Sequence, residues 1–138
     1  MINQSYSESL KTVGFIVANV KGTSMRPLFK EGRDKVYIVN ITDATILKKG
    51  DVVLYRRDDG TLVLHRINKV LPSSFVMMGD NQNVCEYGVT SAHILGKCVG
   101  YYKWDKYIDF SKSLGYKIYK NTYVKCKFLK KVYQKFFI

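Results

Sequence analysis

The feature that most constrains the fold is a series of short apolar runs rich in valine, isoleucine and tyrosine. They follow one another along the first two thirds of the chain, separated by clusters of glycine, aspartate and asparagine. β-Branched and aromatic residues suit a pleated sheet, and no long helical segment separates these runs. The pattern predicts a mainly β fold, with strands in segments 14–22, 35–40, 51–57, 61–70, 74–79 and 94–103.

Two local patterns refine this expectation. The stretch 56–61 has Asp-Gly at its centre, a strong hairpin signal because both residues tolerate positive φ, so we expect a hairpin between the strands on either side. Near the N-terminus, residues 5–10 (SYSESL) predict a short helical turn capped by a serine.

The length and composition predict one compact unit followed by an extension. A chain of 138 residues that is 46% hydrophobic is long enough to bury one core. After Trp104 the composition changes, since residues 105–138 hold nine Lys and two Asp interleaved with apolar side chains. Partial helical spacing there predicts a basic amphipathic helix. We therefore expect a domain over residues 1–104 and a basic extension over residues 105–138.

Charge, cysteines and the N-terminus bear on partners and location. The net charge of +12 points to an anionic partner, either nucleic acid or a lipid surface. Cys85, Cys98 and Cys126 form no Cys-x-x-Cys pair, which predicts reduced thiols in a cytoplasmic protein. The longest apolar run near the N-terminus, 15–18, is much shorter than the ~20 residues of a membrane span, so we expect neither a signal peptide nor a transmembrane helix. No cofactor or metal is expected.

A serine and a histidine are the candidates for chemistry. Ser24 lies in Gly-Thr-Ser-Met-Arg-Pro-Leu (22–28), a turn directly after a predicted strand. A serine hydroxyl is a weak nucleophile without a base, and His65 is better placed than His93 to serve. Strand alternation puts His65 on one face with Val63 and Ile67, where a neutral imidazole can act as base. Taken alone, these residues favour a turn serine and a structural histidine over a catalytic pair, because short motif matches carry false positives.

Five short motifs in order carry a family resemblance. They are GTSMRPLFKEGRDKVYI, KKGDVVLYRR, LVLHRI, FVMMGDN and ILGKCVG, spread over roughly residues 14–103. The series resembles the conserved boxes of type I signal peptidases and LexA-like serine peptidases, whose fold is mainly β. The third box holds a lysine in the bacterial housekeeping enzymes and a histidine in the endoplasmic-reticulum, archaeal and sporulation type. His65 occupies that position.

The resemblance implies a mechanism for the pair. Ser24 would attack the scissile carbonyl, and His65 would take the hydroxyl proton and return it to the leaving amine. Either Asp80 or Glu86 would orient the imidazole, and both assignments stay open. The backbone N–H of Ser24 would supply one oxyanion donor. Family members often have a serine two residues before the nucleophile, where this chain has Gly22, so the second donor also stays open.

The neighbours of the serine suggest a substrate groove. Met25, Pro27 and Leu28 are expected either to line an apolar groove in which an extended peptide adds as a strand, or to pack in the core.

The basic extension has a candidate partner of its own. Lysines of the extension gain about 1 kcal/mol each near anionic lipid. The extension is therefore expected either to lie on the cytoplasmic face of a membrane or to be solvated or packed on the core.

The sequence therefore favours a serine endopeptidase that cleaves a precursor, leader or signal peptide. A peptide-binding module on the same fold, which holds a peptide without cutting it, is the alternative. Nucleic-acid binding ranks third, because the charge supports it but no recognised nucleic-acid motif is present.

Overall fold

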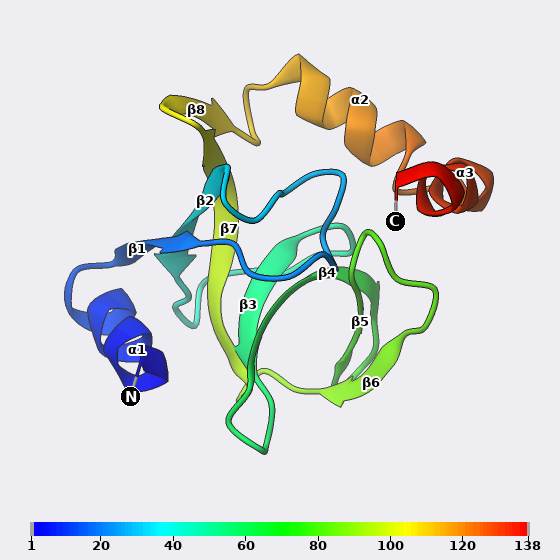
Figure 1. Ribbon diagram of the computed structural model, residues 1–138. Helices are drawn as coiled ribbons and strands as arrows, with labels where there is room; N and C mark the ends of the chain where they lie inside the picture. Colours follow the sequence, from blue (N-terminus) through cyan, green and yellow to red (C-terminus); the bar gives the residue numbers. More distant parts are fainter. Residues whose placement is uncertain (1, 138) are drawn as a thin grey trace.

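Eight antiparallel strands form the body of the protein in a computed structural model that describes residues 2–137, with side chains from residue 6 onward (Figure 1). The strand order is β1-β2-β7-β3-β4-β5-β6, and β8 pairs with β7 outside this path. The mainly β prediction is confirmed. The strands are β1 (Phe15–Asn19), β2 (Asp34–Asn40), β3 (Val52–Arg56), β4 (Leu62–Val70), β5 (Phe75–Met78), β6 (Glu86–Val89), β7 (Ile94–Lys103) and β8 (Lys106–Asp109).

Each predicted strand is present, but two further strands were not predicted. These are β6 and β8, each four residues long, and neither is long enough to show a clear alternation of apolar and polar residues. Strand β6 also contains Gly88, a residue that is depleted in strands.

The predicted hairpin joins β3 to β4. The Arg57 N–H donates to the Thr61 carbonyl at 2.9 Å, and Gly60 adopts a φ of 90° that an L-residue with a side chain avoids. In the register of this hairpin Val53 faces His65, and Tyr55 faces Val63. Tyr55 and His65 are therefore diagonal neighbours on one face of the sheet, close enough for two rings to interact.

Two clusters of buried side chains form the core. The larger one lies among β1, β2, β7, the segment after β1 and the helices, and includes Met25, Phe29 and Ile38. The smaller one lies among β3, β4, β5 and β6, and includes Tyr55 and Ile67. Figure 1 shows the sheet curling so strongly in this second region that the four strands surround it.

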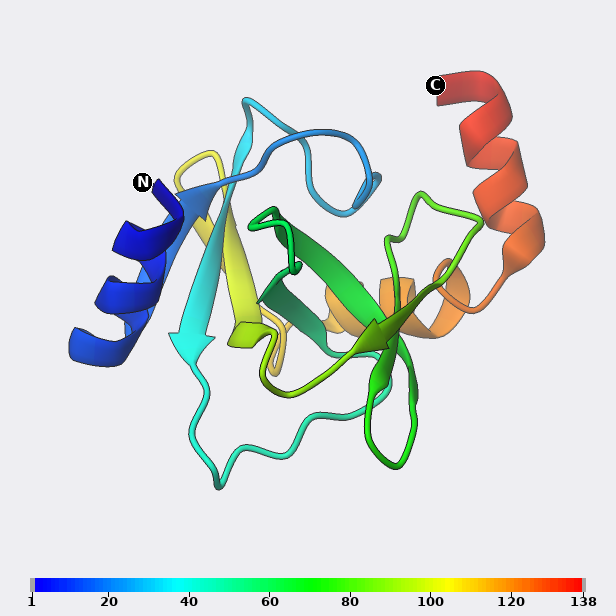
Figure 2. The same ribbon diagram turned by 90° about the horizontal axis from the view of Figure 1, so that it is seen from below.

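Three helices flank the curled sheet. Helix α1 (Ile2–Thr12) packs on β1 and buries Leu10, and it is longer than the predicted turn at 5–10. Helices α2 (Leu114–Thr122) and α3 (Lys127–Phe137) lie on the opposite side of the molecule from α1, as Figure 2 shows. Within residues 2–137, no helix is both long and apolar enough to cross a bilayer.

The C-terminal extension differs from the single helix that was predicted. Its first residues form β8, which pairs with β7, and its helical part is divided into α2 and α3. The Ser113 hydroxyl caps α2 by accepting from the Tyr116 N–H at 3.1 Å. Tyr116 packs in the larger core cluster and stacks on Phe110, so aromatic contacts hold α2 against the sheet.

Candidate active site

The turn that carries Ser24 is held by the loop after β5. The Asn81 N–H donates to the Ser24 carbonyl at 2.8 Å, and the Asn81 side-chain amide donates to the Thr23 carbonyl at 3.0 Å. A Cβ on Gly79 would lie 2.5 Å from that Ser24 carbonyl oxygen, closer than real Cβ contacts come. Only glycine therefore fits at position 79 while the turn keeps its position.

His65 reaches Ser24 from the middle of β4. Its Nε2 lies 3.1 Å from the Ser24 Oγ, although the two residues are 41 positions apart in the chain. The predicted strand face is confirmed, because His65 is buried together with Val63 and Ile67. The structure thus brings together the serine and the histidine that the sequence singled out.

The other ring nitrogen of His65 contacts a tyrosine. The Tyr55 hydroxyl lies 3.3 Å from the His65 Nδ1 and donates to the Glu86 carboxylate at 2.7 Å. Because the hydroxyl proton of Tyr55 goes to Glu86, we assign the ring proton of His65 to Nδ1, which donates to the tyrosine oxygen. The Nε2 then has a free lone pair that can accept the proton of the Ser24 hydroxyl.

An arginine fixes the carboxylate at the far end of this chain of contacts. The Arg57 guanidinium binds Glu86 through two hydrogen bonds of 2.9 and 2.8 Å. These bonds are the main reason why the pKa of Glu86 is lowered, and the carboxylate is ionised at neutral pH. The Glu86 carboxylate therefore accepts hydrogen bonds from both Tyr55 and Arg57.

The surroundings keep His65 neutral. Burial, and next the positive charge of Arg57, lower the pKa of His65 to about 4, while the negative charges of Glu86 and Asp80 oppose this shift. At pH 7 the imidazole is uncharged and can accept a proton. Burial is also the main cause that raises the pKa of Tyr55, which keeps its hydroxyl protonated and able to donate.

Asp80 lies in a different network. Its two carboxylate oxygens each accept from Arg66 at 2.8 Å, and the Tyr119 hydroxyl donates to one of them at 2.8 Å. Arg66 follows His65 in β4, so its side chain points to the opposite face of the sheet. Of the two candidate acids, Glu86 is linked to His65 through Tyr55, whereas Asp80 forms a buried ion pair that joins the sheet to α2.

A cavity of about 520 Å³ opens beside the serine and histidine. Met25 contributes to its wall, as does Tyr6 from α1, while Leu28 is buried in the larger core cluster and Pro27 is half-buried outside the lining. Most of the other lining residues are apolar and come from β1, the segment after it, β2 and the β3–β4 hairpin; they include Ala18, Val20, Val36, Ile38, Leu54, Leu62, Val63 and Leu64.

Tyr55 and Arg57 were not among the candidates from the sequence. Tyr55 belongs to an apolar strand, where a tyrosine is usually a core residue, and Arg57 adjoins a hairpin turn, where charge is usually solvated. The only sequence signal was their spacing, since Tyr55 and Arg57 alternate with Arg56 and so share a strand face.

The site and the mainly β fold agree with a partial sequence similarity to a peptidase. Over 72 residues the chain is 35% identical to signal peptidase I W of Bacillus subtilis (strain 168). The match covers 49% of this chain and only 37% of that protein. No family model matches the chain, and no solved structure matches it. The similarity supports a signal peptidase I-like relationship and, at that coarse level, a peptidase-like function.

Proposed function

We propose that this protein is a serine endopeptidase of the histidine type, related to signal peptidases, that cleaves a precursor, leader or signal peptide. The observation that carries the proposal is the 3.1 Å contact between the Ser24 Oγ and the His65 Nε2, in a histidine kept neutral by its surroundings. The partial similarity to a signal peptidase points to the same class of substrate.

The contacts support a two-step acyl transfer. As the Ser24 oxygen bonds to the scissile carbonyl carbon, the His65 Nε2 takes the hydroxyl proton, and it then gives this proton to the departing amine. The resulting ester is hydrolysed when His65 takes a proton from an incoming water, and the hydroxyl of Ser24 is regenerated. The backbone N–H of Ser24 donates to no acceptor among the described residues, so it is free to bind the oxyanion.

Tyr55 and Glu86 would act as positioning residues in this mechanism. The imidazolium that forms during proton transfer donates from Nδ1 to the Tyr55 oxygen, and Tyr55 donates in turn to Glu86. The negative charge of Glu86 stabilises the transient positive charge on His65 through one intervening hydroxyl. Arg57 weakens this effect, since its charge opposes protonation of His65.

The cavity favours an extended peptide as the substrate. β1 ends the strand order, so its outer edge pairs with no described strand, and residues at and after its end contribute to the cavity wall. A peptide added along this edge would gain backbone hydrogen bonds and would bring its side chains against apolar residues such as Met25 and Leu54.

The direct test is cleavage of precursor peptides by the purified protein. A panel of synthetic signal and leader peptides is incubated with the native protein, with Ser24→Ala and with Ser73→Ala, which removes an exposed hydroxyl elsewhere. We expect cleavage by the native protein and by Ser73→Ala, and none by Ser24→Ala. Cleavage that survives in Ser24→Ala would refute the proposal, and a peptide recovered uncut from a tight complex with the native protein would identify a binding module instead.

A further inference from the structure

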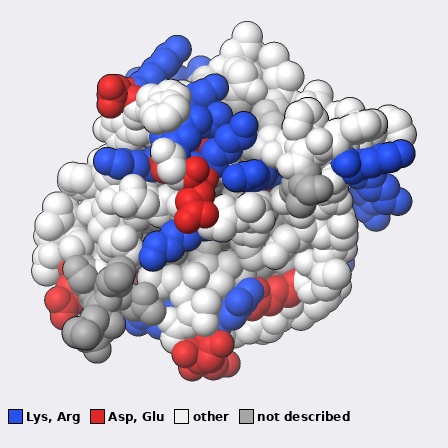
Figure 3. Space-filling model, in the orientation of Figure 1, with Lys and Arg blue, Asp and Glu red and all other residues white. Residues whose placement is uncertain are grey.

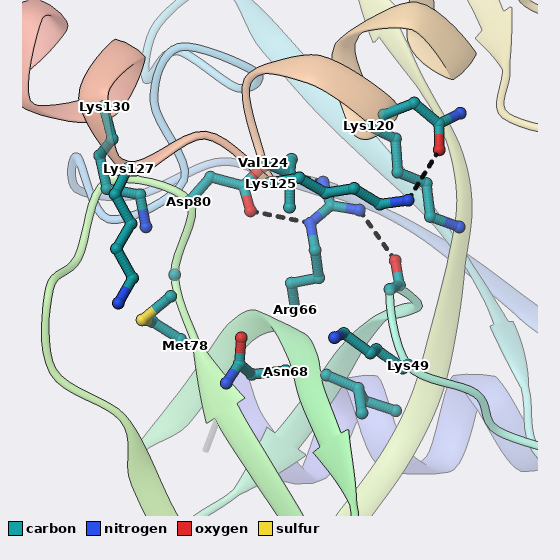
Figure 4. Close-up of a pocket in the computed structure, with 14 residues that line it drawn as sticks. Lys49, Arg66, Asn68, Met78, Asp80, Lys120, Val124, Lys125, Lys127 and Lys130 are labelled. Carbon is teal, nitrogen blue, oxygen red and sulfur yellow. Dashed lines mark hydrogen bonds and ion pairs between the residues drawn. The ribbon is translucent and has the colours of Figure 1, made fainter.

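A second cavity, of about 570 Å³, lies on the other side of β4 from Ser24, between the sheet and the two C-terminal helices. Figure 4 shows Lys127 and Lys130 on one side of it, Lys49 and Lys120 on the other, and Arg66 with Asp80 between them. Lys125, from the segment between α2 and α3, also lines it. Five lysines, from the loop before β3, from α2, from the segment after α2 and from α3, therefore surround one cavity.

Acids balance only part of the positive charge of this cavity: Asp51, outside the lining, opposes the lowering of the pKa of Lys120 and pairs with Lys97. Asp80 is the one acidic residue in its described lining, and its oxygens are already occupied by Arg66 and Tyr119. Among residues 2–137, none of the five lysines forms an ion pair. Residues 110–138 contain eight lysines and no Asp or Glu, and Figure 3 shows lysine side chains gathered at the right edge, where α3 lies.

Burial disfavours the charged form of two of these lysines. Lys130 is only 5% exposed, its Nζ donates to the Gln82 carbonyl at 2.8 Å, and burial lowers its pKa. Burial, and next the charge of Arg66, lower the pKa of Lys120. Each ammonium has three N–H groups, so Lys130 retains donors beyond the one that Gln82 uses. A bound anion would accept from these donors and reduce the repulsion among the lysines.

We propose that this cavity binds a phosphate-bearing anion. Phosphate carries more than one negative charge and several acceptor oxygens, which suits several ammonium groups arranged around one space better than a single carboxylate does. The lysine-lined cavity is separate from the cavity that contains Ser24 and His65, so the inference does not depend on the proposed peptidase activity.

The phosphate has two chemical sources, a soluble phosphorylated compound and the headgroup of an anionic phospholipid. Phe128 and Phe136 are 71% and 70% exposed on α3. By helical spacing they lie on the side of α3 away from Lys130, where they are free to contact a bilayer. Binding measurements with each source distinguish the two.

The test uses the full chain and two matched variants. Lys125→Gln/Lys127→Gln removes two charges from the cavity, and Lys131→Gln/Lys135→Gln removes two charges from α3 outside its lining. Binding of pyrophosphate is measured by calorimetry at low salt. Binding to vesicles of equimolar phosphatidylcholine and phosphatidylglycerol is measured by co-sedimentation, with pure phosphatidylcholine as the reference. Circular dichroism confirms that each variant is folded.

We expect the cavity variant to lose about tenfold in affinity, because two charges that face the anion are removed, and the control variant less than about twofold. Saturable binding of pyrophosphate supports a soluble ligand, and binding of the anionic vesicles alone supports a lipid headgroup. The proposal is overturned if neither probe binds, or if both variants weaken binding equally, because the charge would then act diffusely.

Discussion

The Tyr55 hydroxyl stands between His65 and Glu86, 3.3 Å from the His65 Nδ1 and 2.7 Å from the Glu86 carboxylate. In the usual serine peptidase arrangement a carboxylate contacts the histidine directly. Here a neutral hydroxyl lies between the two groups, and Arg57 binds the carboxylate through two hydrogen bonds; in the proposed mechanism the hydroxyl would transmit the effect of the carboxylate.

Removal of the Tyr55 hydroxyl should lower activity without unfolding the protein. Tyr55→Phe keeps the buried ring and deletes the one group that links His65 to Glu86. We expect kcat to fall about tenfold to a hundredfold, as for loss of a buried hydrogen bond of ~1–3 kcal/mol, with KM nearly unchanged. Steady-state kinetics on a cleaved peptide measure both constants. Tyr87→Phe, on an exposed ring, is the control, and an equal loss in both variants would refute a specific role for Tyr55.

The pH profile of kcat/KM should have its acid limb near the pKa of about 4 that burial and Arg57 give His65. Above that pH the imidazole is neutral and accepts the serine proton, and below it the imidazolium cannot. An acid limb near 6.5, the ordinary value for histidine, would contradict the described surroundings of His65.

The free energy of unfolding should also depend on the protonation of His65. His65 titrates near 6.5 in the unfolded chain and near 4 in the folded one, so the unfolded chain binds more protons between these values. The contribution of His65 to the free energy of unfolding is therefore complete above pH 6.5 and is lost as the pH falls toward 4. Urea denaturation at a series of pH values measures this, and His65→Gln should reduce the slope across that window.

Arg57→Gln should move the acid limb upward. The charge of Arg57 lowers the pKa of His65, whereas that of Glu86 raises it. Loss of the arginine removes the first effect and leaves the second unopposed, so the imidazolium is favoured. Glu86→Gln should shift the limb the opposite way and lower kcat. The pH profiles of the two variants give the comparison, and shifts in the same direction would be inconsistent with this electrostatic account.

Substitutions of the two candidate acids, Asp80 and Glu86, should differ in their effects on stability and on kcat. Asp80→Asn leaves the buried Arg66 guanidinium without its counter-charge, and we expect the free energy of unfolding to fall by about 3–5 kcal/mol. Glu86→Gln acts on a partly exposed pair, so its effect on stability should be much smaller. Urea denaturation together with kinetics on the folded fraction measures both. A larger loss of kcat in Asp80→Asn than in Glu86→Gln would reverse the proposed roles.

Gly79→Ala should displace the Ser24 turn. The added Cβ would meet the Ser24 carbonyl oxygen at 2.5 Å. We expect a clear loss of kcat together with only a small change in the free energy of unfolding. Gly115→Ala is the matched control, because the nearest atom to its added Cβ is the Ser113 Oγ at 3.8 Å. Equal activity in the two variants would show that the contact at Gly79 does not position Ser24.

Much of the architecture could be predicted because each strand carries its own pattern. The Asp-Gly turn, the alternation around His65 and the apolar runs are local features, and the family resemblance placed Ser24 and His65 in one site. Tyr55 could not be assigned, since its role depends on β6 bringing Glu86 beside it, and β6 is too short to be recognised from sequence. The ion pair of Asp80 with Arg66 likewise depends on how the loop after β5 folds back.

The central claim is that His65 activates the hydroxyl of Ser24, and labelling with a fluorophosphonate tests it most directly. The serine oxygen displaces fluoride from phosphorus, and the hydroxyl proton passes to His65, so the reaction needs the activated pair but no peptide substrate. Intact-mass and peptide mass spectrometry locate the adduct. The account predicts a single adduct on Ser24 that is absent in Ser24→Ala and in His65→Gln and is retained in Ser73→Ala. An unlabelled native protein, or an adduct on Ser24 that forms equally fast in His65→Gln, would contradict it.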